Sequence, residues 1–351
     1  MRLKSEIDIA FALVRNAIDG TVPEVEHMDA HNWWHLFRLM QQNHVSALIF
    51  EALPREDVPR DVLIPWLAEH EKVVARYRHQ CDVQQQLLDL MSAHGIETLV
   101  LKGTHLAQYY PRPELREFGD LDLYFYDRHA KADEVARREL HVEVDKHAHH
   151  HTRYELRGVT VESHYDFLNT HYPPSNRRYE ALLKELSTLH SPLSTFEVLF
   201  ILRHMACHFA ASRITLRDLV DWTLTCRALQ DKVDWGKVKT VVKDFGMEPF
   251  VAALNAIAAR RLGLTSPFAS SPSSGLPSQA TVEAVERDLI YGSRHSDDIG
   301  PDGIARLPWK LRRWHAHRWK RRMVFSDSEP RLLLANLTSH AEKPASILHK
   351  M

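Results

Sequence analysis

The sequence predicts an α+β fold: a small mixed β-sheet core with its own helices, flanked by helical regions on both sides. Residues 5–95 and 195–264 space apolar side chains three and four apart, as amphipathic helices do. Residues 96–168 instead hold short apolar runs bounded by turn residues, which is typical of strands. With 351 residues and 44% hydrophobic content, the chain is long enough to bury a sizeable core.

We expect three regions along the chain. These are an N-terminal helical region (1–94), an α/β core (95–190) and a C-terminal helical region (191–351). Inside the last region, residues 265–279 are rich in serine and proline, which is typical of a flexible insertion.

The N-terminal region is expected to contain helices at 7–17, 33–48 and 66–94. Three prolines interrupt the apolar pattern between the second and the third helix. The last of them, Pro65, suits the first turn of the long helix, because the N–H group that proline lacks has no helical partner there.

The core is expected to follow the order β-α-β-α-β-β. Its elements are a strand at 96–101, a short helix at 104–109, a strand at 120–126, an exposed helix at 127–140 and two strands at 149–156 and 159–165. Arg157-Gly158 between the last two strands is a two-residue hairpin signal.

Bulk composition disfavours several classes of protein. Lys plus Arg (45) nearly cancels Asp plus Glu (46), so no global field attracts nucleic acid or a membrane surface. The three cysteines lack metal-type spacing, which favours a reducing, cytoplasmic setting. We find neither a signal peptide nor an apolar run long enough for a membrane span. Glycine-rich loops of the dinucleotide-binding and P-loop types are also missing.

The segment around Asp120 and Asp122 is the most informative part of the sequence. Side chains alternate along a strand, so both carboxylates point to one face. Two carboxylates so placed can bind one or two divalent cations, as chemistry on a nucleoside triphosphate requires. Glu162 lies on a strand that could pair beside this one. It would then help to hold a second metal ion or deprotonate an acceptor.

This combination resembles the nucleotidyltransferase superfamily that includes DNA polymerase beta and the aminoglycoside nucleotidyltransferases. It resembles more closely the bacterial group of uncharacterised nucleotidyltransferase family proteins. The resemblance covers roughly residues 30–230, and its specificity comes from the combination of seven stretches: Asn43–Phe50, Gly95–Gly103, Tyr109–Arg116, Gly119–Leu123, Glu162-Ser163-His164, His204–His208 and Leu216–Trp222. It implies a nucleotidyl-transfer fold, Mg²⁺ or Mn²⁺ as metal, and an NTP, ATP in the first instance, as co-substrate.

The resemblance also implies roles for individual residues. Asp120, Asp122 and Glu162 would be the catalytic metal ligands, and the NTP would be contacted by Lys102, Gly103, Thr104, Arg116 and His164. Two departures stand out: Glu162 replaces a more usual aspartate, and Lys102-Gly103-Thr104 lacks the usual serine, for which Thr104 could substitute.

Two of these residues have alternative roles. Arg116 could bind phosphate or orient Asp122 through a bidentate contact. His164 could bind phosphate, orient the acceptor or be a structural histidine. Asp218 and Asp221, on a later helix, could hydrogen-bond to the nucleotide or to Arg217, or serve only in helix packing.

We therefore expect a metal-dependent nucleotidyltransferase. It would transfer a nucleoside monophosphate, AMP in the first instance, to a hydroxyl or similar group on a small-molecule, peptide or protein acceptor that the sequence does not name. Two alternatives stay open: a catalytically idle NTP-binding protein, antitoxin-like or a scaffold, and a phosphotransferase on the same fold.

Other motifs are compatible with several roles. The His147–His151 tract could bind a metal adventitiously or form a polar strand. His204 and His208 share a helix face, but no further ligands stand at zinc spacing, so packing is the expected role. The basic run 306–322 carries three tryptophans. They could stack on bases, lie at a membrane surface or pack on the body of the protein, so nucleic acid stays open as a partner. The basic run could also dock an acidic acceptor or a partner protein.

Overall fold

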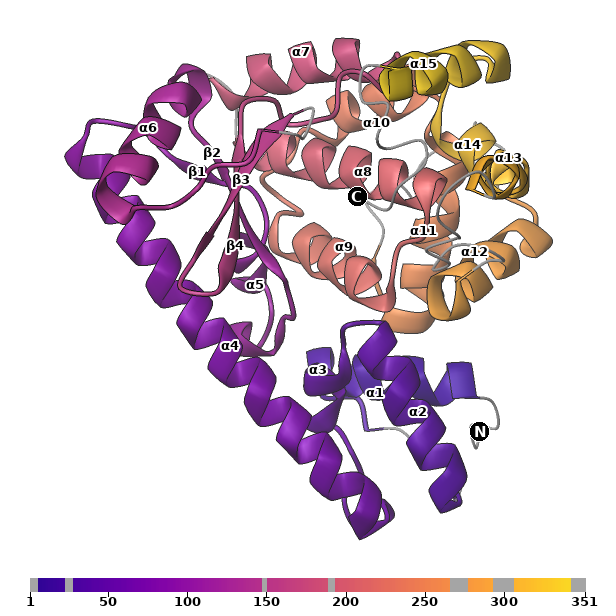
Figure 1. Ribbon diagram of the computed structural model, residues 1–351. Helices are drawn as coiled ribbons and strands as arrows, with labels where there is room; N and C mark the ends of the chain where they lie inside the picture. The colour runs from indigo at the N-terminus through magenta and orange to yellow at the C-terminus, as the bar shows by residue number, and fades with distance from the viewer. Residues whose placement is uncertain are drawn as a thin grey trace. The chain divides into compact units, whose positions relative to one another are not determined.

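The computed structural model describes residues 6–22, 28–146, 150–188, 193–265, 277–292 and 306–341. It confirms the α+β fold: the residues in these ranges are mostly helical and include a four-stranded mixed sheet (Figure 1). None of the described helices combines the length and the apolar character that crossing a membrane requires.

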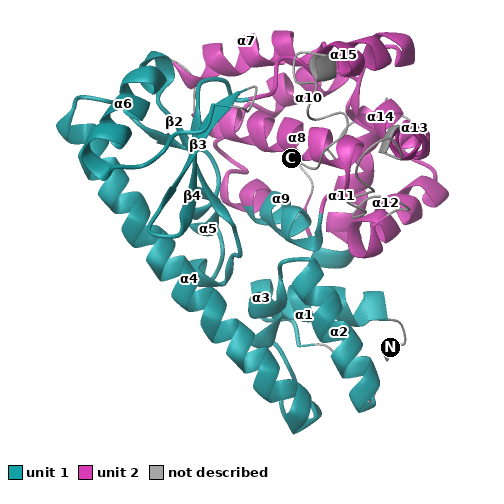
Figure 2. Ribbon diagram, viewed as in Figure 1, with its two compact units in different colours: residues 1–167, 215–224, 261–263 teal, residues 168–214, 225–260, 264–351 magenta. Residues whose placement is uncertain are grey.

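The chain forms two compact units (Figure 2). Residues 1–167, 215–224 and 261–263 make up the first unit, and residues 168–214, 225–260 and 264–351 make up the second. The sheet lies wholly in the first unit. The three-region division expected from the sequence stays a prediction.

Helices of the first unit lie close to their expected positions. They are α1 (Glu6–Asp19), α2 (Ala30–Gln42), α3 (Ser46–Phe50), α4 (Arg60–Ala93), α5 (Thr104–Ala107) and α6 (His129–Leu140), with short 3₁₀ turns η1 (Pro113–Leu115) and η2 (Tyr126–Arg128). The single helix expected at 33–48 is interrupted because His44 takes a left-handed φ of 56°, which a right-handed helix cannot accommodate.

The long helix α4 corrects the prediction for Pro65. It begins at Arg60 with Pro59 before it, so Pro65 lies inside the helix and not at its start. The helix therefore loses one backbone hydrogen bond at Pro65. Val62 and Trp66, both fully buried, anchor these turns and offset that loss.

The sheet contains β1 (Leu99–Val100), β2 (Asp120–Tyr124), β3 (His151–Leu156) and β4 (Val159–His164) in the order β1-β2-β4-β3. β2 and β4 are parallel, and the two outer strands are antiparallel to their neighbours. Arg157 and Gly158 both have positive φ, at 53° and 77°, which confirms the predicted two-residue hairpin between β3 and β4.

One face of the sheet is apolar and fixes its register. Leu121, Leu123 and Val161 point to this face and belong to a buried cluster with residues of α4 and α6, among them Leu87 and Val135. A one-residue slip would turn these side chains away from the core, so burial specifies the register. The alternate residues of the same strands point to the opposite face.

The second unit is helical. Its helices are α7 (Asn176–Ser187), α8 (Leu193–Ala211), α10 (Trp235–Asp244), α12 (Gln279–Tyr291), α13 (Arg306–Ala316), α14 (Arg318–Val324) and α15 (Glu329–Ala341). Two helices belong to both units: α9 (Leu216–Ala228) begins in the first unit, and α11 (Glu248–Leu262) ends in it. α8 is buried on most of its surface and packs against α7, α10 and α14. Most of the expected insertion 265–279 lies outside the described residues.

The basic run 306–322 forms α13 and α14. Trp309 is buried, and the Arg321 guanidinium lies 3.6 Å from the centre of the Trp314 ring. Lys320 is also buried, with its Nζ 2.7 Å from Asp288 Oδ1. These tryptophans and cations are engaged within the second unit, which favours the packing alternative for this run.

Candidate active site

The register of the two central strands places Asp122 beside Glu162. They are partner residues on the parallel strands β2 and β4, so their side chains point to the same face. Asp120 lies two residues earlier on β2, opposite Thr160, and shares that face. The predicted neighbourhood of the three carboxylates is therefore present in the fold.

Asp122 is the most buried of these carboxylates, with 2% of its surface exposed. Its Oδ1 lies 3.0 Å from Lys102 Nζ and 3.1 Å from His164 Nε2. Burial alone would raise the pKa of Asp122, but the Lys102 charge and the hydrogen bond from His164 outweigh it and hold that pKa well below its usual range. Asp122 is therefore ionised at neutral pH.

The other two carboxylates respond differently to the same surroundings. Burial and the negative charge of Asp122 raise the pKa of Asp120, although Lys102 offsets part of this effect. Burial also acts to raise the pKa of Glu162, but the hydrogen bond from His164 outweighs it, so the net shift is downward. The three carboxylates thus lie close together, and the negative charge of Asp120 is the one that neighbouring cationic groups balance least.

His164 bridges two of the carboxylates. Its Nε2 lies 3.1 Å from Asp122 Oδ1 and 3.5 Å from Glu162 Oε2, while Nδ1 donates to the Asp166 carbonyl at 3.2 Å. Burial acts to lower the pKa of His164, but its hydrogen bonds to Asp122 and Glu162 dominate and raise it to about 9. The imidazole is therefore held in one orientation by three acceptors.

The loop after β1 carries Lys102, Gly103 and Thr104. The Leu101 amide donates to the Asp122 carbonyl at 3.0 Å, which ties the start of the loop to β2. Gly103 has a φ of 55°, and a Cβ there would lie 3.3 Å from the Phe118 ring, so only glycine fits without strain. The Thr104 hydroxyl donates to Gln84 Oε1 on α4 at 2.5 Å.

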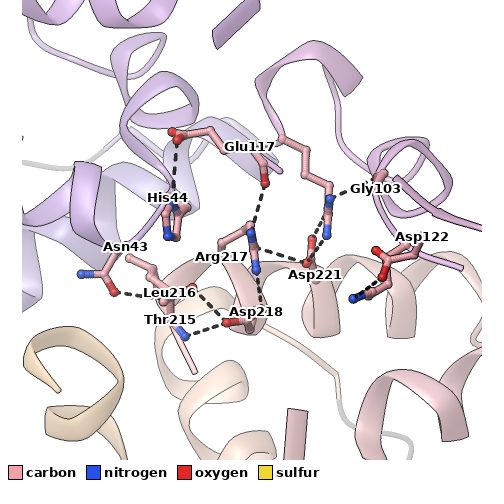
Figure 3. A network of polar contacts seen from close by, with 12 residues as sticks. Asn43, His44, Gly103, Glu117, Asp122, Thr215, Leu216, Arg217, Asp218 and Asp221 are labelled. Carbon is pink, nitrogen blue, oxygen red and sulfur yellow. Dashed lines mark hydrogen bonds and ion pairs between the residues drawn. The ribbon is translucent and has the colours of Figure 1, made fainter. Parts of the chain in front are cut away.

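Arg116 contacts the loop and not the carboxylates of the sheet. It is buried and forms a bidentate pair with Asp221, with Nε and Nη2 each 2.8 Å from a carboxylate oxygen (Figure 3). Its Nη1 donates to the Gly103 carbonyl at 3.1 Å. The bidentate contact that the sequence suggested between Arg116 and Asp122 is therefore made with Asp221 instead. Contact of Arg116 with a phosphate stays a prediction.

Asp221 belongs to a wider network, of which the sequence predicted only the contacts with Arg217. The Tyr110 hydroxyl donates to Asp221 Oδ1 at 2.8 Å. Arg217 bonds to Asp218 at 3.0 Å and to the Glu117 carbonyl at 3.3 Å (Figure 3). The partners of Asp221 come from a segment more than 100 residues earlier in the chain, and the sequence contains no local signal for that pairing.

Donor chemistry at the carboxylate face fits a divalent cation. Asp122, Glu162 and His164 each offer a ligand atom, and these atoms lie within 4.8 Å of one another. Carboxylate oxygens suit Mg²⁺ and Mn²⁺, and an imidazole nitrogen is a further ligand for transition metals. Burial and the negative charge of Asp122 raise the pKa of Asp120, and a cation would relieve the second of these effects. Asp120 is not in this close group, and its role as a ligand stays a prediction.

The structure describes only some of the histidines in the other two motifs. His147 and His149 lie outside the described residues. The His204 and His208 rings have their centroids 4.3 Å apart on α8, and they join no group of three potential ligands within the described ranges.

Comparison with known proteins identifies the chain at the level of a family. A search of curated proteins and a search of solved structures gave no match. A family model described as "Uncharacterised nucleotidyltransferase" matches residues 29–263, which include all of the sheet and the Arg116–Asp221 network. The chain therefore belongs to this uncharacterised nucleotidyltransferase family.

Proposed function

We propose that the protein transfers a nucleoside monophosphate from an NTP to a hydroxyl or similar acceptor at the carboxylate face of its sheet. The observation that carries the proposal is the pairing of Asp122 with Glu162 on adjacent parallel strands, with Asp120 on the same face. ATP as the nucleotide, Mg²⁺ or Mn²⁺ as the metal and the cytoplasm as the compartment are parts of this proposal.

Asp120, Asp122 and Glu162 are the proposed metal ligands. A bound divalent cation would neutralise charge on the triphosphate and polarise its phosphorus–oxygen bonds. Asp122 and Glu162 suit this role because both are held ionised by neighbouring cationic groups. Because both residues have fixed positions on two strands, the site does not need to reorganise when the triphosphate binds.

Lys102, Gly103 and Thr104 are proposed to contact the phosphates. Lys102 Nζ lies 3.0 Å from Asp122, so it would be close to the phosphates of a nucleotide bound through a metal ion at that carboxylate. Arg116 acts here as a positioning residue, because it holds the Gly103 carbonyl and thereby the turn. His164 is proposed to orient Asp122 and Glu162 through its two contacts.

In the proposed reaction, the acceptor oxygen attacks the α-phosphorus and forms the new phosphorus–oxygen bond. The bond from the α-phosphorus to the bridging oxygen breaks, and pyrophosphate leaves with that electron pair. The acceptor proton passes to the Glu162 carboxylate, and Lys102 stabilises the negative charge that develops on the leaving group. Most of the catalysis would come from positioning and charge neutralisation.

Nucleotide binding and product analysis test the proposal. Calorimetry should show that the protein binds ATP only when Mg²⁺ or Mn²⁺ is present. The double variant Asp120→Ala/Asp122→Ala should lose this binding while its circular dichroism is unchanged. With ATP labelled at the α- or the γ-phosphate, label from the α-position should appear in AMP or in an adenylylated product.

Glu155→Gln is a matched control, since Glu155 is an exposed acid on β3 that faces the same side of the sheet. It should bind ATP as the wild-type protein does. Unchanged binding or transfer in the double variant would contradict the proposal. Transfer of γ-label without α-label would replace it with phosphotransferase activity, and binding without any turnover would favour an idle NTP-binding protein.

A further inference from the structure

Three imidazoles gather at one end of the β3–β4 hairpin. His151, the first residue of β3, pairs with His164, the last residue of β4, so both side chains point to the carboxylate face. The ring centroids are 5.1 Å apart for this pair. The His150 ring lies 4.5 Å from that of His151 and 5.4 Å from that of His164.

The backbone fixes His150 even though it precedes the strand. Its carbonyl accepts hydrogen bonds from the Tyr165 and Asp166 amides, at 3.1 and 3.2 Å. The Asp166 carbonyl in turn accepts from His164 Nδ1. The His150 backbone and the His164 imidazole are thus both bonded to the same short segment after β4.

The nitrogens of this cluster have unused bonding capacity. Nδ1 of His150 and Nδ1 of His151 are buried and find no hydrogen-bond partner among the described residues. These two nitrogen atoms are therefore available to a ligand.

Each of the three histidines offers a nitrogen atom, and these atoms lie within 4.8 Å of one another. Glu162 is next to them, with its carboxylate oxygens 3.4 Å from His151 Nε2 and 3.5 Å from His164 Nε2. Three imidazoles and one carboxylate form a donor set typical of tetrahedral Zn²⁺, whereas Mg²⁺ prefers oxygen ligands.

We propose that His150, His151 and His164, with Glu162 as a fourth ligand, form a binding site for Zn²⁺ or a similar transition-metal ion, and that the bound ion displaces one of the protons that His164 donates to its acceptors. The site goes beyond the proposed nucleotide transfer and does not depend on it. It shares Glu162 and His164 with the carboxylate group, so a bound ion would lie at the border of the NTP site.

Metal titration of the untagged full-length protein, first stripped with a chelator, tests this proposal. We expect it to bind one Zn²⁺ per chain and to give, with Co²⁺, the visible absorption of a tetrahedral nitrogen-bound ion, which Zn²⁺ abolishes and excess Mg²⁺ does not. His150→Ala and His151→Ala should each weaken Zn²⁺ binding at least about tenfold. Circular dichroism establishes that both variants fold.

Two histidine pairs serve as controls: His204→Ala/His208→Ala on α8 and His147→Ala/His149→Ala in the same tract. Neither double variant should change the affinity for Zn²⁺. Unchanged affinity in His150→Ala and His151→Ala, or loss only in His147→Ala/His149→Ala, would overturn the proposal. Asp120→Ala removes a carboxylate of the NTP site but no imidazole, so it should retain Zn²⁺ binding, which separates this proposal from the proposed function.

Discussion

Asp122 and Asp221 are both buried aspartates of the first unit, and both contact cationic side chains, but their wider surroundings differ. Asp221 accepts two hydrogen bonds from Arg116 and a third from the Tyr110 hydroxyl. Every one of these partners is a donor, and Arg217 adds a further positive charge 3.9 Å away. Both carboxylate oxygens of Asp221 therefore have donors within the protein itself.

Asp122 instead stands among groups that repel it as well as groups that attract it. Lys102 and His164 compensate its charge, but Asp120 and Glu162 add two carboxylates on the same face. The folded chain has to bring these like charges together, and this lowers its stability. A matched cluster stabilises the fold, whereas a bound cation would relieve a crowded one, and this difference supports the proposal that the Asp122 cluster is the binding site.

The largest effect on stability is expected from Asp221→Ala. This change leaves the buried Arg116 guanidinium unpaired, and breaking a buried ion pair costs about 3–5 kcal/mol. Urea unfolding of the metal-free protein measures the loss. Glu155→Gln, at an exposed position, should stay within about 0.5 kcal/mol of wild type. A loss below about 1 kcal/mol for Asp221→Ala would mean that the network does not support the fold.

Asp122→Asn should have a smaller effect on unfolding than Asp221→Ala, with a loss of about 1–3 kcal/mol. Lys102 is partly exposed to water, and His164 can release its proton, so neither group is left as a buried, unpaired charge. The same variant should lose metal-dependent ATP binding. If it proves as unstable as Asp221→Ala yet still binds ATP, the roles assigned to the two clusters are reversed.

Asp120→Asn should stabilise the metal-free protein, by up to about 1 kcal/mol. The raised pKa of Asp120 means that its charge is disfavoured in the folded state, mainly by burial and by Asp122. Thermal unfolding should therefore show a higher midpoint for the variant in chelator. Mn²⁺ should raise the midpoint of wild type more than that of the variant. A lower midpoint in chelator would show that Asp120 is not under electrostatic strain.

The sequence predicted the crowded cluster better than the matched one, and the reason is physical. Alternation on a strand and a buried apolar face determine which side Asp122 and Glu162 occupy, and both features are local. The Arg116–Asp221 pair joins residues 105 positions apart on elements with no periodic relation, so no pattern indicates it.

Local irregularities also escaped prediction. The break at His44 requires a left-handed φ in a residue that is not glycine, and apolar spacing continues across it. The start of α4 was placed too late because proline is tolerated inside this helix, where Trp66 is buried. The approach of His150 to His164 depends on loop closure after β4, which the spacing of histidines does not encode.

The smallest expected effect is a difference between the Asp221 and Asp122 clusters in how their contribution to stability depends on pH. Asp218 bonds to Arg217 at 3.0 Å and accepts from the Thr215 amide at 2.7 Å, as in a helix capping box. Burial acts to raise the pKa of Asp218, but Arg217 and the Thr215 bond outweigh it and hold that pKa well below its usual range.

A carboxyl with a lowered pKa in the folded state stabilises the protein fully above its unfolded pKa, about 3.9, and loses that contribution as pH falls further. Asp218→Asn should therefore be less stable than wild type at neutral pH, with a difference that narrows below about pH 4. Asp120 has the opposite shift, so the advantage of Asp120→Asn should grow as pH rises through about 4. Urea midpoints across this range measure both differences, and parallel pH curves for the two variants would mean that the clusters do not differ in charge balance.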